Sequence, residues 1–407
     1  MAMLRRWAPR LRGGDGRIGT RNLKLKNREK DRNVAKLAIM TMLHSFAPGG
    51  VERVALRLCG AWAQRPDIDV QLVMGRESGA MVAEAPPHLV RHLIPEPVPT
   101  VAWETPWMLW ILPRHIRRLR PDVLFAAGNT YAIVAVVMKL WLGRRCPPVV
   151  LKISNDLARA DMNPLIRWAY HRWLRIQGCI VDHATGLAEP MRAEIAHFLR
   201  LPADRIHVID DPALSAADHA ALAAIGAARS PAAGPGRDYV GVGRLARQKN
   251  WPLLVSAFAR IAGPDDRLTI IGEGAERSRI LATAVALGVA DRLALPGHGG
   301  VAPALAAGSV YVLSSDFEGV PAVVIEALTS GLPVVATNCS VSMTGLVGEW
   351  GTIVPVGDAA ALASAMAAQA LPSPAVRAAA AADMARFTVE RAADTYLTLF
   401  RKLAGAR

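Results

Sequence analysis

Cysteine is scarce in this chain of 407 residues, and no two of its four cysteines form a CxxC pair. They lie far apart, at Cys59, Cys146, Cys179 and Cys339. This spacing argues against a disulfide framework and against a structural zinc site. The sequence also lacks a His/Cys cluster and an Asp-x-Asp after an apolar strand, so we expect no bound metal and no other resident cofactor.

Long apolar runs are lacking too, although 52% of the residues are hydrophobic. The nearest stretch, 123–143, is interrupted by Gly128, Asn129 and Lys139 and divides into a strand, a loop and a helix. The charged N-terminus is not followed by the apolar run of a secretory signal before residue 36. We therefore expect a cytoplasmic globular protein without a membrane span.

The net charge of +14 is concentrated near the N-terminus. Residues 1–50 contain 12 Lys/Arg and 3 Asp/Glu, whereas residues 216–407 contribute a net charge of only +1. We predict that residues 1–35 are a disordered basic arm, and a start site placed too far upstream would give the same pattern. The functional alternative is an arm that contacts a membrane or a nucleic acid.

From Lys36 onward, apolar runs of strand type alternate with segments of helical spacing. This rhythm predicts an α/β fold with parallel sheets covered on both faces. We predict two Rossmann-like domains, over 36–213 and 237–407, which face each other across a cleft. A linker is expected over 214–236, and the prediction leaves open whether the last helix packs back on the first domain.

Two predicted helices of the first domain combine tryptophan with arginine. The helix at 106–119 contains Trp107 and Trp110 and ends in a basic cluster, and the helix at 165–176 contains Trp168 and Trp173 among further arginines. Each helix alone is explained by an ordinary apolar face with a solvated basic end. Together they favour peripheral contact with an anionic membrane, at its inner face.

The sharpest motif is DFEGVP, residues 316–321, followed by Glu326 in AVVIEAL. The motif lies where a strand passes through a loop into a helix, and this edge of a parallel sheet is where ligands bind. Paired carboxylates at Glu318 and Glu326 can bind sugar and ribose hydroxyls. Alternatively, Glu318 interacts with the helix dipole and Glu326 is a surface charge, but an unpaired charge in an apolar helix segment is costly.

A second motif, GVGRLARQKN at 241–250, runs from a strand through the Gly243 turn towards a helix that Asn250 is placed to cap. Arg244 and Lys249 beside that helix N-terminus suit a diphosphate group. A solvated basic turn is the alternative for this loop taken alone. A third loop follows the next strand and contains Gly272 and Gly274, which we expect near the nucleotide.

Five segments in order resemble the donor half of retaining glycosyltransferase family 4, which has the GT-B fold. They are GRLARQKNW (243–251), IIGEGAERSRI (270–280), EGVPAVVIEAL (318–328), SGLPVVAT (330–337) and GTIVPVGD (351–358). The segment HSFAPGGVERVAL at 44–56 is similar to the glycine loop that opens this family. The resemblance covers residues 37–407.

The resemblance implies a role for each matching residue. Arg244 and Lys249 would hold the donor diphosphate without a metal, Glu318 the transferred sugar and Glu326 the ribose. Gly50 would let the backbone approach the phosphates. Further expected donor contacts are Gly243, Gly272, Gly274, Gly319 and Val320, and His44 and Asn155 are candidate acceptor or sugar contacts.

The sequence departs from the family at three places. Asn155 stands where a histidine is common, so a proton relay through this position is not expected. The usual Asn-Pro before the linker is Asp211-Pro212. The loop SVSMTGLVGE, at 340–349, lacks the common Pro-Arg-Glu signature.

The sequence therefore predicts an enzyme that moves a hexose-type sugar from a nucleotide-sugar donor to a glycan or lipid-linked acceptor, with retention of configuration, in cell-surface polysaccharide synthesis. The choice between UDP and GDP stays open. One alternative is another GT-B enzyme, such as a nucleotide-sugar epimerase. The other is a nucleic-acid-binding protein, but most of the positive charge lies in the arm and no recognition motif accompanies it, so we expect no nucleic-acid partner.

Overall fold

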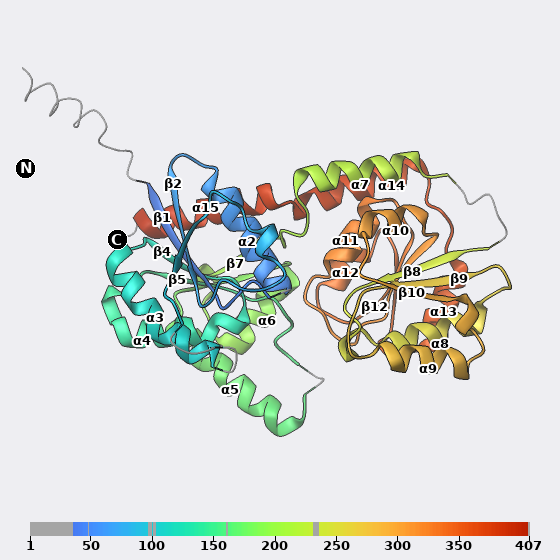
Figure 1. Ribbon diagram of the computed structural model, residues 1–407, viewed down its shortest axis with the longest axis horizontal. Helices are drawn as coiled ribbons and strands as arrows, with labels where there is room; N and C mark the ends of the chain where they lie inside the picture. The colour runs from blue at the N-terminus through green and yellow to red at the C-terminus, as the bar shows by residue number, and fades with distance from the viewer. Residues whose placement is uncertain are drawn as a thin grey trace, which may run out of the picture.

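The computed structural model describes residues 36–47, 49–96, 100, 103–159, 162–230 and 236–405. The predicted basic arm at 1–35 lies outside the described residues, as does the segment 231–235 within the predicted linker. Two parallel sheets form two domains that lie side by side (Figure 1).

The N-terminal sheet has the strand order β3-β2-β1-β4-β5-β6-β7. Thr41 of β1 pairs in register with Leu72 of β2 on one side and Phe125 of β4 on the other. The order of the strands along the sheet reverses between β1 and β4. In open parallel sheets, ligands bind at such a reversal, beyond the carboxyl ends of the strands. The strands are β1 (Leu37–Leu43), β2 (Ile68–Met74), β3 (Val90–Leu93), β4 (Val123–Ala126), β5 (Val149–Lys152), β6 (His183–Gly186) and β7 (Ile206–Val208).

Helices cover both faces of this sheet, which explains the nearly continuous burial of its central strands. On one side lie α2 (Gly50–Ala63) and the last helix, α15 (Val389–Gly405). The other side carries α3 (Glu104–Leu119), α4 (Ala132–Leu142), α5 (Pro164–Ile180) and α6 (Pro190–Leu199) (Figure 1). The Tyr396 and Phe400 rings of α15 pack against Trp62 and Phe125, so the C-terminal helix completes the N-terminal core.

The C-terminal sheet has the strand order β10-β9-β8-β11-β12-β13, and all its neighbours are parallel. Alternate residues of β11 enter two separate cores, Val310 and Val312 on one side and Tyr311 and Leu313 on the other. The strands are β8 (Asp238–Val242), β9 (Arg267–Ile271), β10 (Leu293–Gly297), β11 (Val310–Leu313), β12 (Val334–Thr337) and β13 (Thr352–Val354).

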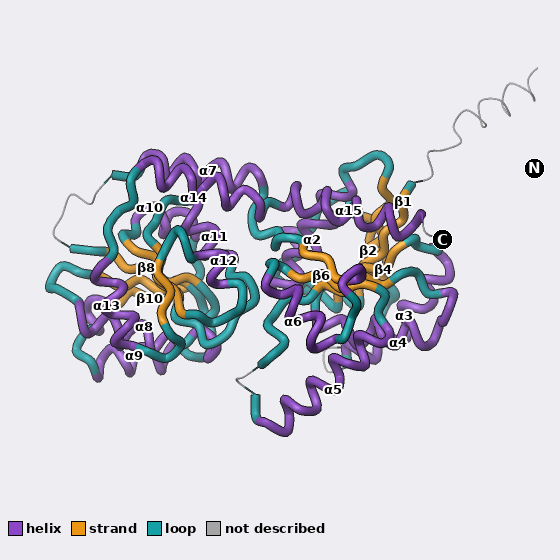
Figure 2. The backbone as a smooth tube through the Cα atoms, turned by 180° about the vertical axis from the view of Figure 1, so that it is seen from behind, coloured by secondary structure: helices purple, strands orange, loops and turns teal. Residues whose placement is uncertain are grey.

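The helices of this domain form two groups. One core is covered by α8 (Trp251–Ile261), α9 (Arg277–Ala286) and α13 (Ala359–Ala368). The other side carries α7 (Ala216–Ala228), α10 (Val301–Ala307), α11 (Ala322–Thr329), α12 (Met343–Val347) and α14 (Pro374–Met384), and Figure 2 shows α7 and α14 side by side.

The stretch that the sequence predicts to be a linker, 214–236, contains the helix α7. Ser215 and Asp218 form a capping box at its start, and Leu222 is buried in the C-terminal domain. Arg229 donates hydrogen bonds to backbone carbonyls of that domain, among them Gly308 O at 2.8 Å. The helix is rich in alanine and has little apolar periodicity, which explains why the pattern did not indicate it.

The chain passes between the domains twice, and the two crossings lie side by side. The backbone N–H of Val389 donates to Leu214 O at 2.7 Å. Beside them Lys152 and Asp211 form a buried ion pair at 2.9 Å, which accounts for aspartate in the Asp-Pro departure. Among the helices described by the structure, none is both long and apolar enough to cross a membrane.

Candidate functional site

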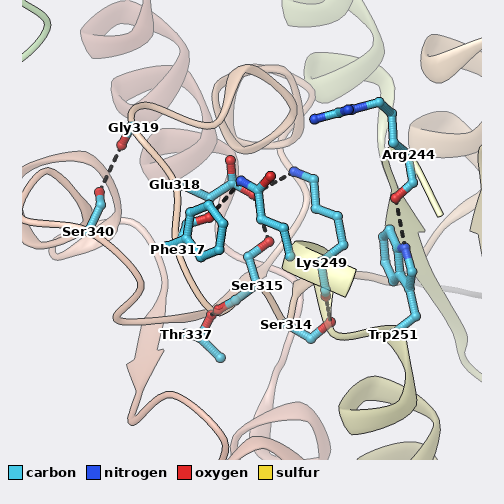
Figure 3. A network of polar contacts seen from close by, with 11 residues as sticks. Arg244, Lys249, Trp251, Ser314, Ser315, Phe317, Glu318, Gly319, Thr337 and Ser340 are labelled. Atoms are coloured by element: carbon cyan, nitrogen blue, oxygen red, sulfur yellow. Dashed lines mark hydrogen bonds and ion pairs between the residues drawn. The ribbon is translucent and has the colours of Figure 1, made fainter. Parts of the chain in front are cut away.

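The Glu318 loop connects β11 to α11 at the carboxyl edge of the C-terminal sheet. The Nζ atom of Lys249 lies 2.6 Å from Glu318 Oε1, and the Ser315 hydroxyl donates to the same oxygen at 2.7 Å (Figure 3). The two charged side chains are only 15% and 11% exposed. The pair is therefore largely shielded from water. Because water weakens electrostatic attraction, the attraction within this pair exceeds that within a surface ion pair.

The two predicted motifs, 241–250 and 316–321, are bound to each other. Two side-chain contacts join them in addition to the ion pair: Asn250 Nδ2 to Asp316 Oδ1 at 2.7 Å, and Gln248 Nε2 to Phe317 O at 2.8 Å. Just before the second motif, Ser314 Oγ donates to Lys249 O at 2.8 Å. Asn250 occupies the N-cap position of α8, but its side chain does not cap the helix, because it donates to Asp316 instead. The motifs therefore form one rigid unit.

Arg244 is fixed through its backbone while its side chain stays exposed. The Trp251 indole donates to Arg244 O at 3.0 Å, and Figure 3 shows the arginine extending towards the side on which Lys249 and Glu318 meet. Within the described part of the chain, Arg244 has no acidic partner. It therefore presents a free positive charge next to the Lys249–Glu318 pair.

Glycines let neighbouring loops of the C-terminal domain approach closely. Gly243, Gly272 and Gly274 all have φ between 146° and 155°, a region that favours glycine. A Cβ at Gly272 would lie 1.9 Å from Gly243 O, so a side chain there would push the two loops apart. These loops can thus bring backbone groups close to a ligand.

Gly319 and Val320 lie at the contact between the domains. A Cβ at Gly319 would lie 2.1 Å from Ser154 O of the N-terminal domain, and Val320 packs against the cores of both domains. The hydroxyls of Ser340 and Ser342 both donate to Gly319 O, at 2.8 and 2.6 Å. Sequence reasoning missed these serines because they belong to the loop that departs from the family signature.

Glu326 lies on α11 in a half-buried position, and one of its carboxylate oxygens is buried and unused. Its Oε2 atom has no hydrogen-bond partner, and burial raises the pKa of the carboxyl to about 7. Arg57 and Arg53 of α2, in the other domain, oppose this shift. A ligand hydroxyl that donates to Oε2 would satisfy the orphaned atom.

The N-terminal candidates are placed differently. Asn155 is exposed, and its Cα would lie 3.5 Å from a Cβ at Gly319, which puts it beside the Glu318 loop. Gly50 begins α2 with open space where a side chain would be. His44 is 8% exposed with its ring centroid 4.9 Å from that of Tyr131, burial lowers its pKa, and its Nδ1 has no partner.

Asp156 is a further polar residue of this boundary that sequence reasoning missed, although it directly follows Asn155. Its carboxylate accepts a hydrogen bond from the backbone of Val341 in the other domain, while its Oδ1 has no partner. Burial and the nearby Glu194 raise the pKa of Asp156 to about 7. Asp156 therefore joins the N-terminal domain to the loop that contains Ser340 and Ser342.

A metal centre is not assembled by the described residues, since they contain no group of three or more His, Cys, Asp or Glu side chains that could hold an ion. The charges at the domain boundary include those of Arg244, Lys249, Glu318 and Glu326. Two cations with glycine-rich backbone can hold a diphosphate, and two carboxylates can accept hydrogen bonds from hydroxyls.

Comparison with known proteins adds independent information. Residues 236–370 match the family described as Glycosyl transferases group 1, and residues 48–211 match Glycosyltransferase Family 4. An uncharacterized glycosyltransferase of Haemophilus influenzae is 38% identical over 109 residues, which cover 26% of this chain and 31% of that protein. The lipopolysaccharide core biosynthesis glycosyltransferase LpsE of Rhizobium meliloti is 35% identical over 127 residues, 31% of this chain and 37% of that protein. The chain thus spans about a third of the length of these two relatives.

Among solved structures, Anabaena Alr3699/HepE in complex with UDP and glucose is similar with a TM-score of 0.69 at 17% sequence identity. The similarity covers 89% of this chain and 99% of that one. At this identity the likeness concerns the fold.

Proposed function

Because the chain belongs to the group 1 glycosyltransferases with the GT-B fold, we propose that it transfers a hexose-type sugar from a nucleotide-sugar donor to a glycan or lipid-linked glycan, with retention of configuration. The predicted membership of the glycosyltransferase family and the predicted GT-B fold are confirmed, while retention of configuration is part of the proposal. The observation that carries the proposal is the shielded Lys249–Glu318 pair beside the free cation of Arg244.

In this proposal the C-terminal loops bind the donor. Arg244 and Lys249 hold the diphosphate and stabilise the negative charge that develops on it as its bond to the sugar breaks. Glu318, already fixed by Lys249 and Ser315, receives hydroxyls of the transferred sugar. Because these groups are in place before the donor binds, little reorganisation accompanies the reaction.

Glu326 would bind the ribose. Its unused buried Oε2 can accept a hydrogen bond from a ribose hydroxyl, which removes the cost of an unsatisfied polar atom. Gly50 at the N-terminus of α2 would let the opposite domain approach the phosphates. The domain contact at Gly319 and Ser154 then sets the distance between the donor and an acceptor beside Asn155.

The relatives support a particular substrate class. The similar Anabaena structure contains UDP and glucose, and this favours a UDP-hexose donor. The name of LpsE refers to lipopolysaccharide core biosynthesis, which favours an acceptor in cell-surface polysaccharide synthesis. We propose that the reaction needs no metal, because Arg244 and Lys249 supply the positive charge.

A lipid-linked acceptor would place the N-terminal domain at a membrane surface. The helices α3, α4 and α5 form one layer of this domain, and they carry the exposed tryptophans Trp110, Trp141 and Trp168 of the described residues. Only Leu174 and Gln177 of α5 are buried. We propose that this layer contacts an anionic membrane at its cytoplasmic face, where aromatic residues and arginines are favourable.

The decisive experiment combines donor binding with product analysis. A thermal-shift screen against UDP, GDP, ADP and their sugars should show stabilisation by UDP, since a ligand at about 100 times its dissociation constant adds roughly 2.7 kcal/mol. Incubation of the stabilising sugar nucleotide with glycan acceptors should give an NMR anomeric signal of the donor's configuration. An inverted product would reject retention, and conversion of the donor without an acceptor would favour an epimerase.

A further inference from the structure

A cationic pocket lies at the outer edge of the N-terminal domain, between the edge strand β3 and helix α3. Its volume is about 330 Å³. The residues that line it are Arg91, His92, Leu93, Ile94, Arg114, His115 and Arg118. None of them belongs to the donor loops, and the proposed transfer reaction does not use them.

Positive charge in this pocket is poorly compensated. Arg91 pairs with Glu77 at 2.6 Å, but the other two guanidinium groups face no acid among the described residues. Arg114 stacks on the Trp110 ring with its Cζ 3.7 Å from the centroid, and Arg118 donates to His92 Nδ1 at 3.3 Å. Both arginines therefore keep donors available for an anion.

The two histidine rings are held in place by hydrogen bonds to residues that do not line the pocket. His92 donates through Nε2 to Gln71 Oε1, and the Gln71 amide donates in turn to Asp69 Oδ1 at 2.5 Å. His115, which is buried, donates through Nδ1 to Ile111 O at 3.1 Å. Burial lowers the pKa of both histidines, and the neighbouring Arg118 adds to the lowering.

We propose that this pocket is a binding site for a phosphate group, held by Arg114 and Arg118 beside the rings of His92 and His115. Two guanidinium forks match the oxygen geometry of a phosphate better than point charges do. The volume admits a phosphate ester with a small substituent, and no acid lines the pocket. The source can be a lipid headgroup, since Trp110 of the same helix is exposed, or a soluble phosphate ester.

The test uses the full chain saturated with UDP, so that the donor site is occupied. Inorganic phosphate and glycerol 3-phosphate are titrated while the NMR ring signals of His92 and His115 are followed. Arg114→Gln with Arg118→Gln should weaken binding about tenfold or more, as expected for loss of charge-assisted hydrogen bonds. The matched control, Arg117→Gln with Arg120→Gln, removes the same charge from the same helix region outside the pocket and should change binding less than threefold.

Equal weakening by both double variants would overturn the proposal, because it would show a diffuse field rather than a site. Unmoved ring signals during the titration would overturn it as well. All four substitutions affect exposed residues, and circular dichroism verifies that the fold is retained. If vesicles containing phosphatidylglycerol bind the pocket variant more weakly than the control variant, the phosphate belongs to a lipid; equal vesicle binding assigns a soluble phosphate ester.

Discussion

The donor loops and the outer layer of helices α3, α4 and α5 both carry positive charge, but the donor loops place the exposed Arg244 beside a shielded ion pair. In the donor loops Lys249 is shielded and paired with Glu318, and hydrogen bonds fix the surrounding backbone. In the outer layer arginines such as Arg117 and Arg172 are exposed and form no ion pair with an acid of the described chain. Three tryptophans of this layer, Trp110, Trp141 and Trp168, are about half exposed, at 49%, 57% and 58%.

This contrast indicates two kinds of partner. A rigid, shielded arrangement favours one small ligand in one geometry, because its charges are already oriented. Exposed cations beside exposed aromatic rings favour a partner with an extended, deformable surface. Salt weakens contacts of this kind. Substitutions in each region can test whether it behaves accordingly.

Removal of a donor-loop cation should have the largest effect. We expect Lys249→Ala and Arg244→Ala each to reduce turnover about 100-fold or more, since each removes a preorganised charge at the leaving group. Steady-state kinetics measure this loss. Arg247→Ala is the matched control, because Arg247 is an exposed cation of the same loop, and it should retain near-normal turnover. Normal turnover in both Ala variants of Lys249 and Arg244 would remove this site from the proposal.

The two glutamates should separate kinetically. Glu318→Gln should mainly lower kcat, because Glu318 would contact the sugar whose charge and geometry change in the transition state. Glu326→Gln should mainly raise the donor KM, roughly 10-fold to 100-fold, since it weakens a charge-assisted hydrogen bond to the ribose. The same kinetic signature in both variants would contradict this division of roles.

Donor binding should depend on pH through Glu326. Burial raises the pKa of this carboxyl to about 7, and a ribose hydroxyl donates to the ionised form. Protonation as the pH falls through 7 should therefore weaken donor binding, up to about tenfold between pH 8 and pH 6. Equilibrium titration at both pH values measures this change. In Glu326→Gln the dependence should be much reduced, and an unchanged dependence would assign it to another group.

In the outer layer, loss of exposed apolar side chains should reduce vesicle binding several-fold. Leu140→Ser with Leu165→Ser alters side chains that are 68% and 73% exposed. The control, Val285→Ser with Leu281→Ser, alters exposed side chains of α9 in the other domain and should leave binding unchanged. Sedimentation with anionic vesicles, at low and high salt, measures both. If the chain does not sediment with vesicles at low salt, the membrane contact is rejected.

Removal of divalent metal should have no effect. We expect activity to persist in excess EDTA, because Arg244 and Lys249 would supply the charge that a metal supplies elsewhere. The assay compares initial rates with EDTA and with EDTA followed by Mg²⁺ or Mn²⁺. A strict metal requirement would show that the charge stabiliser is assigned to the wrong groups.

The sequence predicted the parallel domains and the location of the Glu318 loop, because local apolar runs and turn residues encode both. It missed helix α7, whose alanine-rich composition has no clear apolar face. It placed Asn250 at the start of a helix but misjudged its side chain, which donates to Asp316 instead. The Ser340 and Ser342 contacts with Gly319 depend on tertiary packing between loops, which no local pattern reveals.

The most direct test of the account is the binding of UDP measured by isothermal titration calorimetry. The account predicts that UDP binds the wild-type chain, and that Lys249→Ala and Glu326→Gln each weaken binding by about tenfold or more. It also predicts that Arg247→Ala and the pocket variant Arg114→Gln with Arg118→Gln bind UDP as the wild type does. Unchanged UDP binding in Lys249→Ala would contradict the central claim that the C-terminal loops hold the donor diphosphate.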